Sequence, residues 1–331
     1  MRNALCLFGR LFILPLAFLT APVQAEVDAG LNEGFQVRNR SPMVGIFGLP
    51  SHRSFDLPGE GQYKGGIQLG IHNTFNSTSL GNERLYQDVE TYVLTFSLRR
   101  GLTDNWSLGL DLPLVSHRGG FLDSMIDTWH DWFDLENFDR GDAPEDEIHF
   151  SYSRDGDTVL EIDDDVSDVG DIILSLGRRI GSEDNAALWI ELKAPTGDPD
   201  KLTGSGGFDL GMRFQGRARV GQKSTLFAGL GIAWLEEGDV FAEMQRQWAG
   251  SLTTGYSWQG WKRVALKIQI DAQSAVFKDT NVEFIKESAA QLSLGGSVRV
   301  GKTGFLDIAI VEDEWRAGGS PDFGFTVRYR R

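Results

Sequence analysis

Residues 186–214 read AALWIELKAPTGDPDKLTGSGGFDLGMRF, with apolar and polar side chains alternating at both ends. Leu188, Ile190 and Leu192 alternate with Trp189, Glu191 and Lys193, and the same pattern returns from Phe208 to Gln215. A period of two places successive side chains on opposite faces of a β-strand. The segment therefore predicts two strands joined by a Gly/Pro/Asp-rich loop, each with one apolar and one charged face.

The same alternation recurs along most of the chain, and we count twelve strands. Those preceding residues 186–214 are expected at 63–72, 92–99, 106–112 and 171–177, and those following at 226–234, 248–258, 264–271, 291–300, 306–310 and 323–329. The 264–271 segment is the clearest case, because Leu266, Ile268 and Ile270 stand against Lys267, Gln269 and Asp271. Strands of about ten residues match the tilted crossing of an outer membrane.

The connections alternate in length. Short turns are expected at 101–105, 181–185, 221–224, 259–262 and 301–304, and longer links at 76–84, 115–167, 195–206, 235–246, 272–287 and 313–321. Short periplasmic turns, long outer loops and an even strand count are typical of bacterial outer-membrane barrels. The sequence thus predicts an all-β fold: one antiparallel transmembrane β-barrel over residues 61–331, with short periplasmic turns and long extracellular loops.

Aromatic residues at the strand ends support this prediction. Trp and Tyr favour a membrane interface because their rings are partly apolar and partly polar. One expected girdle lies beside the short turns and the other beside the long loops; the interface candidates are Trp106, Trp258, Trp261 and Tyr329 for the first, and Trp234 and Trp248 for the second.

The first 25 residues resemble a cleavable export signal. Arg2 and Arg10 precede a short apolar run, Leu11–Leu19, and cleavage is expected after Ala25. Removing this leader would leave a chain without cysteine and would change the formal net charge from −15 to −17. Such acidity argues against nucleic acid as a partner. The expected location is the outer membrane of a Gram-negative bacterium, with outer-membrane lipid, lipopolysaccharide and, during insertion, the barrel-assembly machinery as partners.

Residues 26–60 lack a clean period and contain many turn-forming residues. They form either a periplasmic lead-in or a plug inserted in the lumen. The absence of periodicity favours a solvated or loosely docked segment.

Three segments resemble a known family: LKAPTGDPDKLTGSGGFDLG at 192–211, GGFLDSMIDTWHDWF at 119–133 and VRNRSPMVGIFGLP at 37–50. Together they are similar to the proteobacterial family called domain of unknown function 3187. The resemblance covers most of the exported chain and implies an outer-membrane barrel. It implies no substrate and no catalytic residue.

The outer loop at 115–167 interrupts the strand pattern. Between Phe121 and Phe138, Leu122, Met125, Ile126 and Trp129 recur at helical spacing, so we expect a short amphipathic helix. It packs over the barrel mouth, lies at the lipid interface or folds into the pore. The loop is also acidic from Asp139 to Asp168, which could suit Ca²⁺, but the spacing does not match a calcium loop and favours solvation.

The predicted inner face of the barrel carries charges of both signs. These candidates for lining the lumen are Arg99, Asp111, Glu191, Lys193, Asp209, Arg213, Lys267, Asp271 and Asp307, with Lys64 and Arg328 on the same face. In a water-filled lumen they would set ion preference, whereas in a narrow barrel they would pair with one another. The balance of signs favours pairing around a narrow passage.

No catalytic constellation emerges. Ser116 and His117 are adjacent, and neighbouring residues of a strand point to opposite faces. We therefore expect no enzyme, no cofactor and no metal site. The expected function is a narrow channel or binding barrel for passage of a small solute; the alternative is a structural or surface-interaction barrel with a packed lumen.

Overall fold

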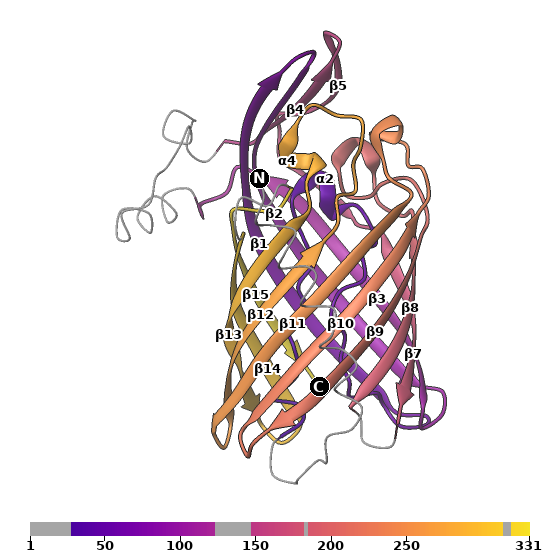
Figure 1. The fold of residues 1–331 in the computed structure, drawn as a ribbon, viewed down its shortest axis with the longest axis vertical. Coiled ribbons are helices and arrows are strands. Elements are labelled where there is room, and N and C mark those ends of the chain that lie inside the picture. Colours follow the sequence, from indigo (N-terminus) through magenta and orange to yellow (C-terminus); the bar gives the residue numbers. More distant parts are fainter. Residues whose placement is uncertain (1–27, 123–146, 182–184, 314–318) are drawn as a thin grey trace, which may run out of the picture.

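The computed structural model describes residues 28–122, 147–181, 185–313 and 319–331. It is a closed antiparallel barrel of twelve strands (Figure 1), in which β1 pairs with β15 and β2 with β3 to complete the ring. The predicted fold class is confirmed. The barrel strands are β1 (Tyr63–Leu80), β2 (Glu83–Gly101), β3 (Trp106–Arg118), β7 (Ile172–Ile180), β8 (Ala186–Ala194), β9 (Asp209–Val220), β10 (Ser224–Leu235), β11 (Trp248–Trp261), β12 (Val264–Gln273), β13 (Ala289–Val300), β14 (Gly304–Asp313) and β15 (Phe323–Arg330).

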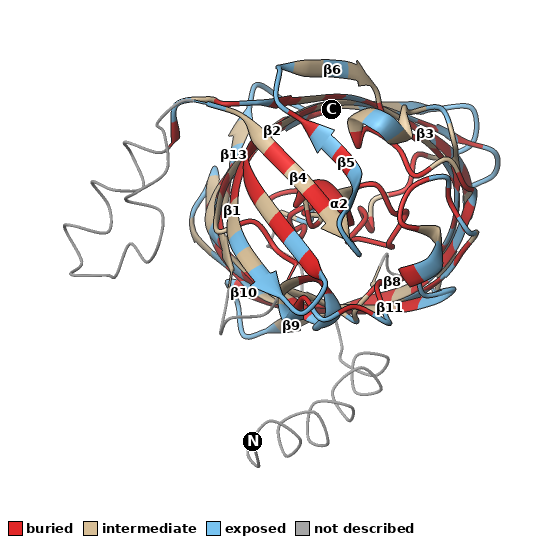
Figure 2. Ribbon diagram, turned by 90° about the horizontal axis from the view of Figure 1, so that it is seen from above, coloured by how far each residue is buried: buried red, intermediate tan, exposed pale blue. Residues whose placement is uncertain are grey.

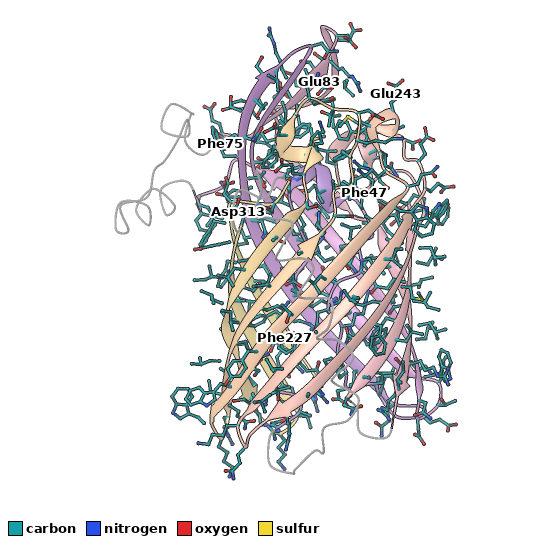
Figure 3. The ribbon with its side chains drawn as sticks, in the orientation of Figure 1. Phe47, Phe75, Glu83, Phe227, Glu243 and Asp313 are labelled. Carbon is teal, nitrogen blue, oxygen red and sulfur yellow. The ribbon has the colours of Figure 1, made fainter. Side chains whose placement is uncertain are left out.

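Alternation along each strand separates a lipid-facing from an inward-facing set of side chains. On β12, Ile268 is 43% exposed on the outside, whereas Gln269 is fully buried inside. Large apolar side chains on the other strands, such as Leu110, Leu174 and Ile308, are exposed in the same way, and side chains surround the wall in Figure 3. A soluble protein rarely exposes so continuous an apolar surface. This band is the surface that meets the bilayer.

Predicted interface aromatics lie at both ends of this band. Trp234 and Trp248 face each other across β10 and β11 at the long-loop end. At the short-turn end, the rings of Trp258 and Trp261 pack edge to face with centroids 5.5 Å apart. Trp106 and Tyr329 lie at that same end, on β3 and β15.

The first hairpin is longer than expected. The link predicted at 76–84 is wrong, because β1 continues to Leu80 and β2 begins at Glu83. Asn76, Ser77 and Thr78 interrupt the apolar alternation, since above the membrane neither strand face meets lipid. Pairing with further strands stabilises this extension, which projects beyond the ring in Figure 1.

The expected loop at 115–167 contains more strand than the sequence indicated. β4 (His149–Arg154) pairs with the upper part of β2, and β5 (Asp157–Ile162) pairs with β4. β6 (Val166–Val169) pairs with the end of β3. The amphipathic helix expected at 121–138 and the acidic residues 139–146 fall almost wholly outside the described residues.

An apolar cluster closes the long-loop end. It joins β4 and β5 to four short helices or their neighbours: α2 (Pro42–Gly45), η3 (Pro199–Lys201), η4 (Ala242–Met244) and α4 (Glu283–Lys286). Tyr152 and Phe277 both pack edge to face on Phe241, and Phe277 also packs on Phe47. No helix in the described ranges is long and apolar enough to span a bilayer.

Residues 28–60 run inside the barrel, and Figure 2 shows chain crossing the interior of the ring. Phe35, Met43 and Phe55 of this segment are each at most 2% exposed. The expectation of a solvated or loosely docked segment is therefore wrong for these residues. The segment forms no strand and only one short helix, and many of its contacts are with distant strands, so these residues leave no periodic pattern in the sequence.

Candidate functional site

The inner wall of the barrel is polar and rich in small residues. Ser107, Ser175, Ser257, Ser293 and Thr253 face inward and are nearly fully buried. Gly211 and Gly231 also face inward, and a Cβ atom added to either would lie 2.8–3.0 Å from Pro50 of the inner segment. Eight-stranded barrels are filled by their own side chains, whereas wider barrels enclose space. This twelve-stranded wall leaves a lumen that a separate segment occupies.

The inner segment, residues 28–60, forms a loop that enters and leaves at the short-turn end. Its ascending leg begins at Asp28, whose amide donates to Gln259, and reaches Asn39, which donates to the carbonyl of Gly319 near the outer end. The chain turns through α2, which is part of the apolar cluster. Its descending leg returns to Glu60, which bridges to Gly101 at the end of β2. We call residues 28–60 the inner loop.

Arg53 is the most heavily bonded residue of the inner loop. Its guanidinium is fully buried and lies 2.6 Å from Asp111 on β3 and 2.8 Å from Glu191 on β8. The guanidinium also lies 5.7 Å from the centroid of the Trp189 ring. Arg38 of the ascending leg donates to the same Glu191 at 2.9 Å. The two legs are thus joined through one wall carboxylate.

Polar wall residues also bind the backbone of the inner loop. Gln269 accepts from the amide of Phe35 at 2.7 Å and donates to its carbonyl at 2.9 Å, as a neighbouring strand would. Asp209 accepts from the amide of Gly48 at 2.7 Å. Ser251 donates to the carbonyl of Pro50 at 2.7 Å. Side chains of the wall therefore satisfy backbone groups that would otherwise be buried without partners.

Apolar contacts complete the packing near the short-turn end. Phe55 and Leu57 of the inner loop pack with Trp189 and Phe227 of the wall. His52 lies against both Phe55 and Phe227, with ring centroids 5.4 Å apart in each case. In Figure 3, Phe227 lies within the barrel outline well below Phe47, which belongs to the outer apolar cluster.

Little free volume remains between the inner loop and the wall. Cavities of about 30 Å³ and 50 Å³ lie along the loop, lined by residues such as Arg38, Phe47 and Gln68. About 10–15 Å³ measured in this way is enough to hold one water molecule. These spaces accommodate water molecules, and the lumen is closed to larger solutes in this conformation.

All nine residues predicted to line the lumen face inward, but most contact the inner loop or each other rather than open water. Lys193 lies 2.7 Å from Asp171 and 3.1 Å from Asp209 on the adjacent strand. Lys267 lies 3.4 Å from Asp307, which also accepts from Arg330 at 2.8 Å. The remaining contacts are Asp111 and Glu191 with Arg53, Arg213 with the Pro50 carbonyl, Asp271 with Thr253 and Gln269, and Arg99 over the ring of Trp189.

Sequence reasoning missed the partners on the inner loop. Arg53 and Arg38 lie in a segment without periodicity. On the wall, Gln269 binds the backbone of Phe35 and Gln215 binds the backbone of Arg53, but both are uncharged and were not among the charged candidates. One signal was available: Phe35, Phe47 and Phe55 are large apolar residues in a segment expected to be solvated.

Other candidate chemistry is accounted for by structural contacts. His117 is buried and lies within hydrogen-bond distance of Thr91 and the Leu202 carbonyl, whereas Ser116 faces Ser167. As expected for neighbours on a strand, Ser116 and His117 do not pair. Across the described ranges, no group of three or more His, Cys, Asp or Glu residues is arranged to hold a metal ion.

Outside the membrane, Lys201, the last residue of η3, links to β6. Its ammonium lies 2.8 Å from Asp168 and 3.0 Å from Asp198. The hydrogen bond from Lys201 lowers the pKa of Asp168, and the same contacts raise the pKa of Lys201 to about 12. This exposed pair connects β6 to the loop between β8 and β9.

Comparison with known structures identifies similar barrels. A COG4313 outer membrane channel from Pseudomonas putida F1 aligns with a TM-score of 0.57 at 15% identity, covering 83% of this chain and 96% of that one. The toluene transporter TbuX of Ralstonia pickettii aligns with a TM-score of 0.41 at 8% identity, covering 83% and 90% of the respective chains. The first similarity shows a shared fold. No curated protein matches the sequence significantly.

Comparison with protein families gives a more specific assignment than comparison with structures. The model of the family described as "Protein of unknown function (DUF3187)" matches residues 12–331, which includes the inner loop and every strand of the barrel. The resemblance seen in the three sequence segments is thereby confirmed. The chain belongs to the DUF3187 family of proteins of unknown function.

Proposed function

We propose that this protein is a gated outer-membrane channel for small polar solutes, and that the inner loop is its gate. The observation that carries the proposal is the composition of the wall. Its inward face is mostly Gly, Ser, Thr, Gln and charged residues, with a few apolar side chains such as Trp189 and Phe227, and a separate loop fills the space between them. A barrel built only for structure needs no such space, because eight strands already form a wall whose own side chains fill the interior.

The contacts of the gate also favour movement. Hydrogen bonds and ion pairs hold the inner loop along much of its length, and water can replace such contacts when the loop leaves. The exposed polar wall would then line a hydrated path, with Glu191, Lys193, Asp209 and Arg213 along it. A polar lining favours polar rather than hydrocarbon solutes.

A reversible crosslink between loop and wall tests the proposal. A Cβ atom on Gly231 would lie 3.0 Å from Cβ of Pro50, close to the 3.5–4.5 Å of disulfides. The double variant Pro50→Cys/Gly231→Cys changes no charge, and the single native cysteine, Cys6, lies in the expected leader. In liposome swelling with small sugars and amino acids, the reduced variant should admit solute and the oxidised variant should not.

The rival function is a non-transporting surface barrel, and the apolar cluster over the outer mouth is the observation that favours it. Solute exclusion by both the reduced variant and the wild type would support that rival, provided that both proteins show the heat-shifted gel band of a folded barrel. Equal swelling rates in the oxidised and reduced variant would show that the inner loop is not the gate.

A further inference from the structure

A cavity of about 70 Å³ lies at the short-turn end of the barrel, between the descending leg of the inner loop and the strands β1, β2 and β15. Five cationic side chains line it: Lys64, Arg99, Arg328, Arg330 and Arg331. Asp56 is the acidic residue in its lining. The chain as a whole has a formal charge of −15, so this is a local concentration of positive charge in an acidic protein.

Two of the five cations already have carboxylate partners. Lys64 forms an ion pair with Asp56 of the inner loop. Arg330 donates from Nε to Asp307 at 2.8 Å. These pairs anchor the loop and the end of β15, whereas Arg99 and Arg328 form no direct ion pair within the described residues.

Arg99 and Arg328 are buried without such partners. Arg99 is 6% exposed and Arg328 is 7% exposed, and within the described residues neither lies within 4 Å of a carboxylate. Nε and one Nη of Arg99 find no hydrogen-bond acceptor in the described part of the chain. The guanidinium of Arg99 lies over the Trp189 ring, 5.2 Å from its centroid, which restricts its orientation. A buried guanidinium with unused donors is costly unless an anion or water satisfies it.

Strand register brings these groups to one place. On one side of β1, Lys64 pairs with Arg99 of β2; on the other side, Gln68 pairs with Arg328 of β15. Gly66 lies between them on the inward face of β1 and has no side chain to fill the space. The cavity is therefore bounded by arginines on both neighbouring strands and has a glycine in its wall.

We propose that this cavity binds a small soluble oxyanion of the size of phosphate or sulfate. Guanidinium groups present planar, fork-shaped donors that match oxyanion geometry. About 10–15 Å³ measured in this way holds one water molecule, so the cavity has room for several waters or for one small tetrahedral anion. Arg99 and Arg328 face the interior of the barrel, and the lining residues Thr303 and Arg331 are exposed at its short-turn end. The proposal does not rest on the gating function, although Ser54 and Asp56 of the inner loop form part of the lining.

Equilibrium binding of inorganic phosphate to the purified, folded full chain in phosphate-free detergent buffer tests the proposal, with sulfate as competitor. Phosphate should bind saturably and sulfate should displace it. Arg99→Gln and Arg328→Gln should each weaken binding by at least about tenfold, because each removes charge-assisted hydrogen bonds. Arg100→Gln is the matched control: it removes the same charge from the next residue of β2, which lies outside the barrel over Tyr63. This control should bind phosphate like the wild type.

A second variant tests the location without changing charge. Gly66→Val keeps all five cations and fills the cavity, so it should also lose phosphate binding while retaining the heat-shifted gel band. Absence of saturable phosphate binding to folded wild-type protein would overturn the proposal, as would unchanged binding in both arginine variants or in Gly66→Val. Displacement of phosphate by phosphatidylglycerol micelles would assign the site to a lipid headgroup and would overturn the proposal that it binds a soluble anion.

Discussion

Replacing Arg53 with Met separates the energetics of the inner loop from those of the barrel wall. Arg53 is fully buried, and its guanidinium contacts Asp111 at 2.6 Å and Glu191 at 2.8 Å. Methionine keeps much of the apolar stem and removes the charge. Asp111 then has no cation in contact, and Glu191 keeps only Arg38.

Breaking a buried ion pair by removing one partner costs about 3–5 kcal/mol. This cost falls on the occupied lumen, because water solvates Asp111 and Glu191 once the loop leaves. The equilibrium should therefore shift toward the withdrawn loop by roughly two to three and a half orders of magnitude, at about 1.4 kcal/mol per factor of ten. Since Arg38 still compensates Glu191, we expect a value near the lower end.

Single-channel recording in planar bilayers measures this shift directly. Arg53→Met should increase the open fraction by about a hundredfold, with an unchanged heat-shifted gel band. The matched control is Arg40→Met, which removes the same charge from the same loop; within the described residues Arg40 lies within 4 Å of no carboxylate, and it lines a cavity. Equal open fractions in Arg53→Met and wild type, or equal increases in the two variants, would refute the reasoning.

Three further predictions follow from the wall and the outer loops. Ile268→Arg places a charge on the lipid face near mid-membrane and should destabilise the inserted barrel by about 2–4 kcal/mol, measured by urea unfolding in lipid vesicles. Gln269→Ala should leave barrel insertion intact but loosen the inner loop at Phe35, detected as faster amide hydrogen exchange there; slowed insertion would contradict this assignment. Lys201→Met should raise the pKa of Asp168 toward its ordinary value in an NMR titration. Because that pKa is lowered in the folded protein, the wild-type link should be intact at neutral pH and be lost only as the pH falls through the lowered value.

The facing of the strands was predictable from sequence because it depends on local alternation. Ile268 and Gln269 lie on opposite faces as the period of two requires, and the wall contact between Lys193 and Asp209 follows from antiparallel pairing. The inner loop was not predictable in this way, because Arg53 contacts residues 58 and 138 positions away and forms no regular element with them. The outer extension of β1 and β2 was missed for a related reason: above the bilayer, pairing with β4 replaces lipid burial and the apolar alternation disappears.

The path of the inner loop has a mechanical consequence. Both legs pass through the short-turn end of the barrel, from Asp28 on one side to Glu60 on the other, so withdrawal toward the periplasm requires no chain end to be threaded through the wall. Tension applied at Asp28 would act on the ascending leg first, breaking the contacts of Asn32, Phe35 and Arg38 in sequence. Peeling of this kind requires less force than sliding a packed element out as one body, because only the contacts at the moving front bear the load. Separating two barrel strands would require them to slide along each other and break many hydrogen bonds at once. The barrel would therefore stay closed while the inner loop detaches contact by contact.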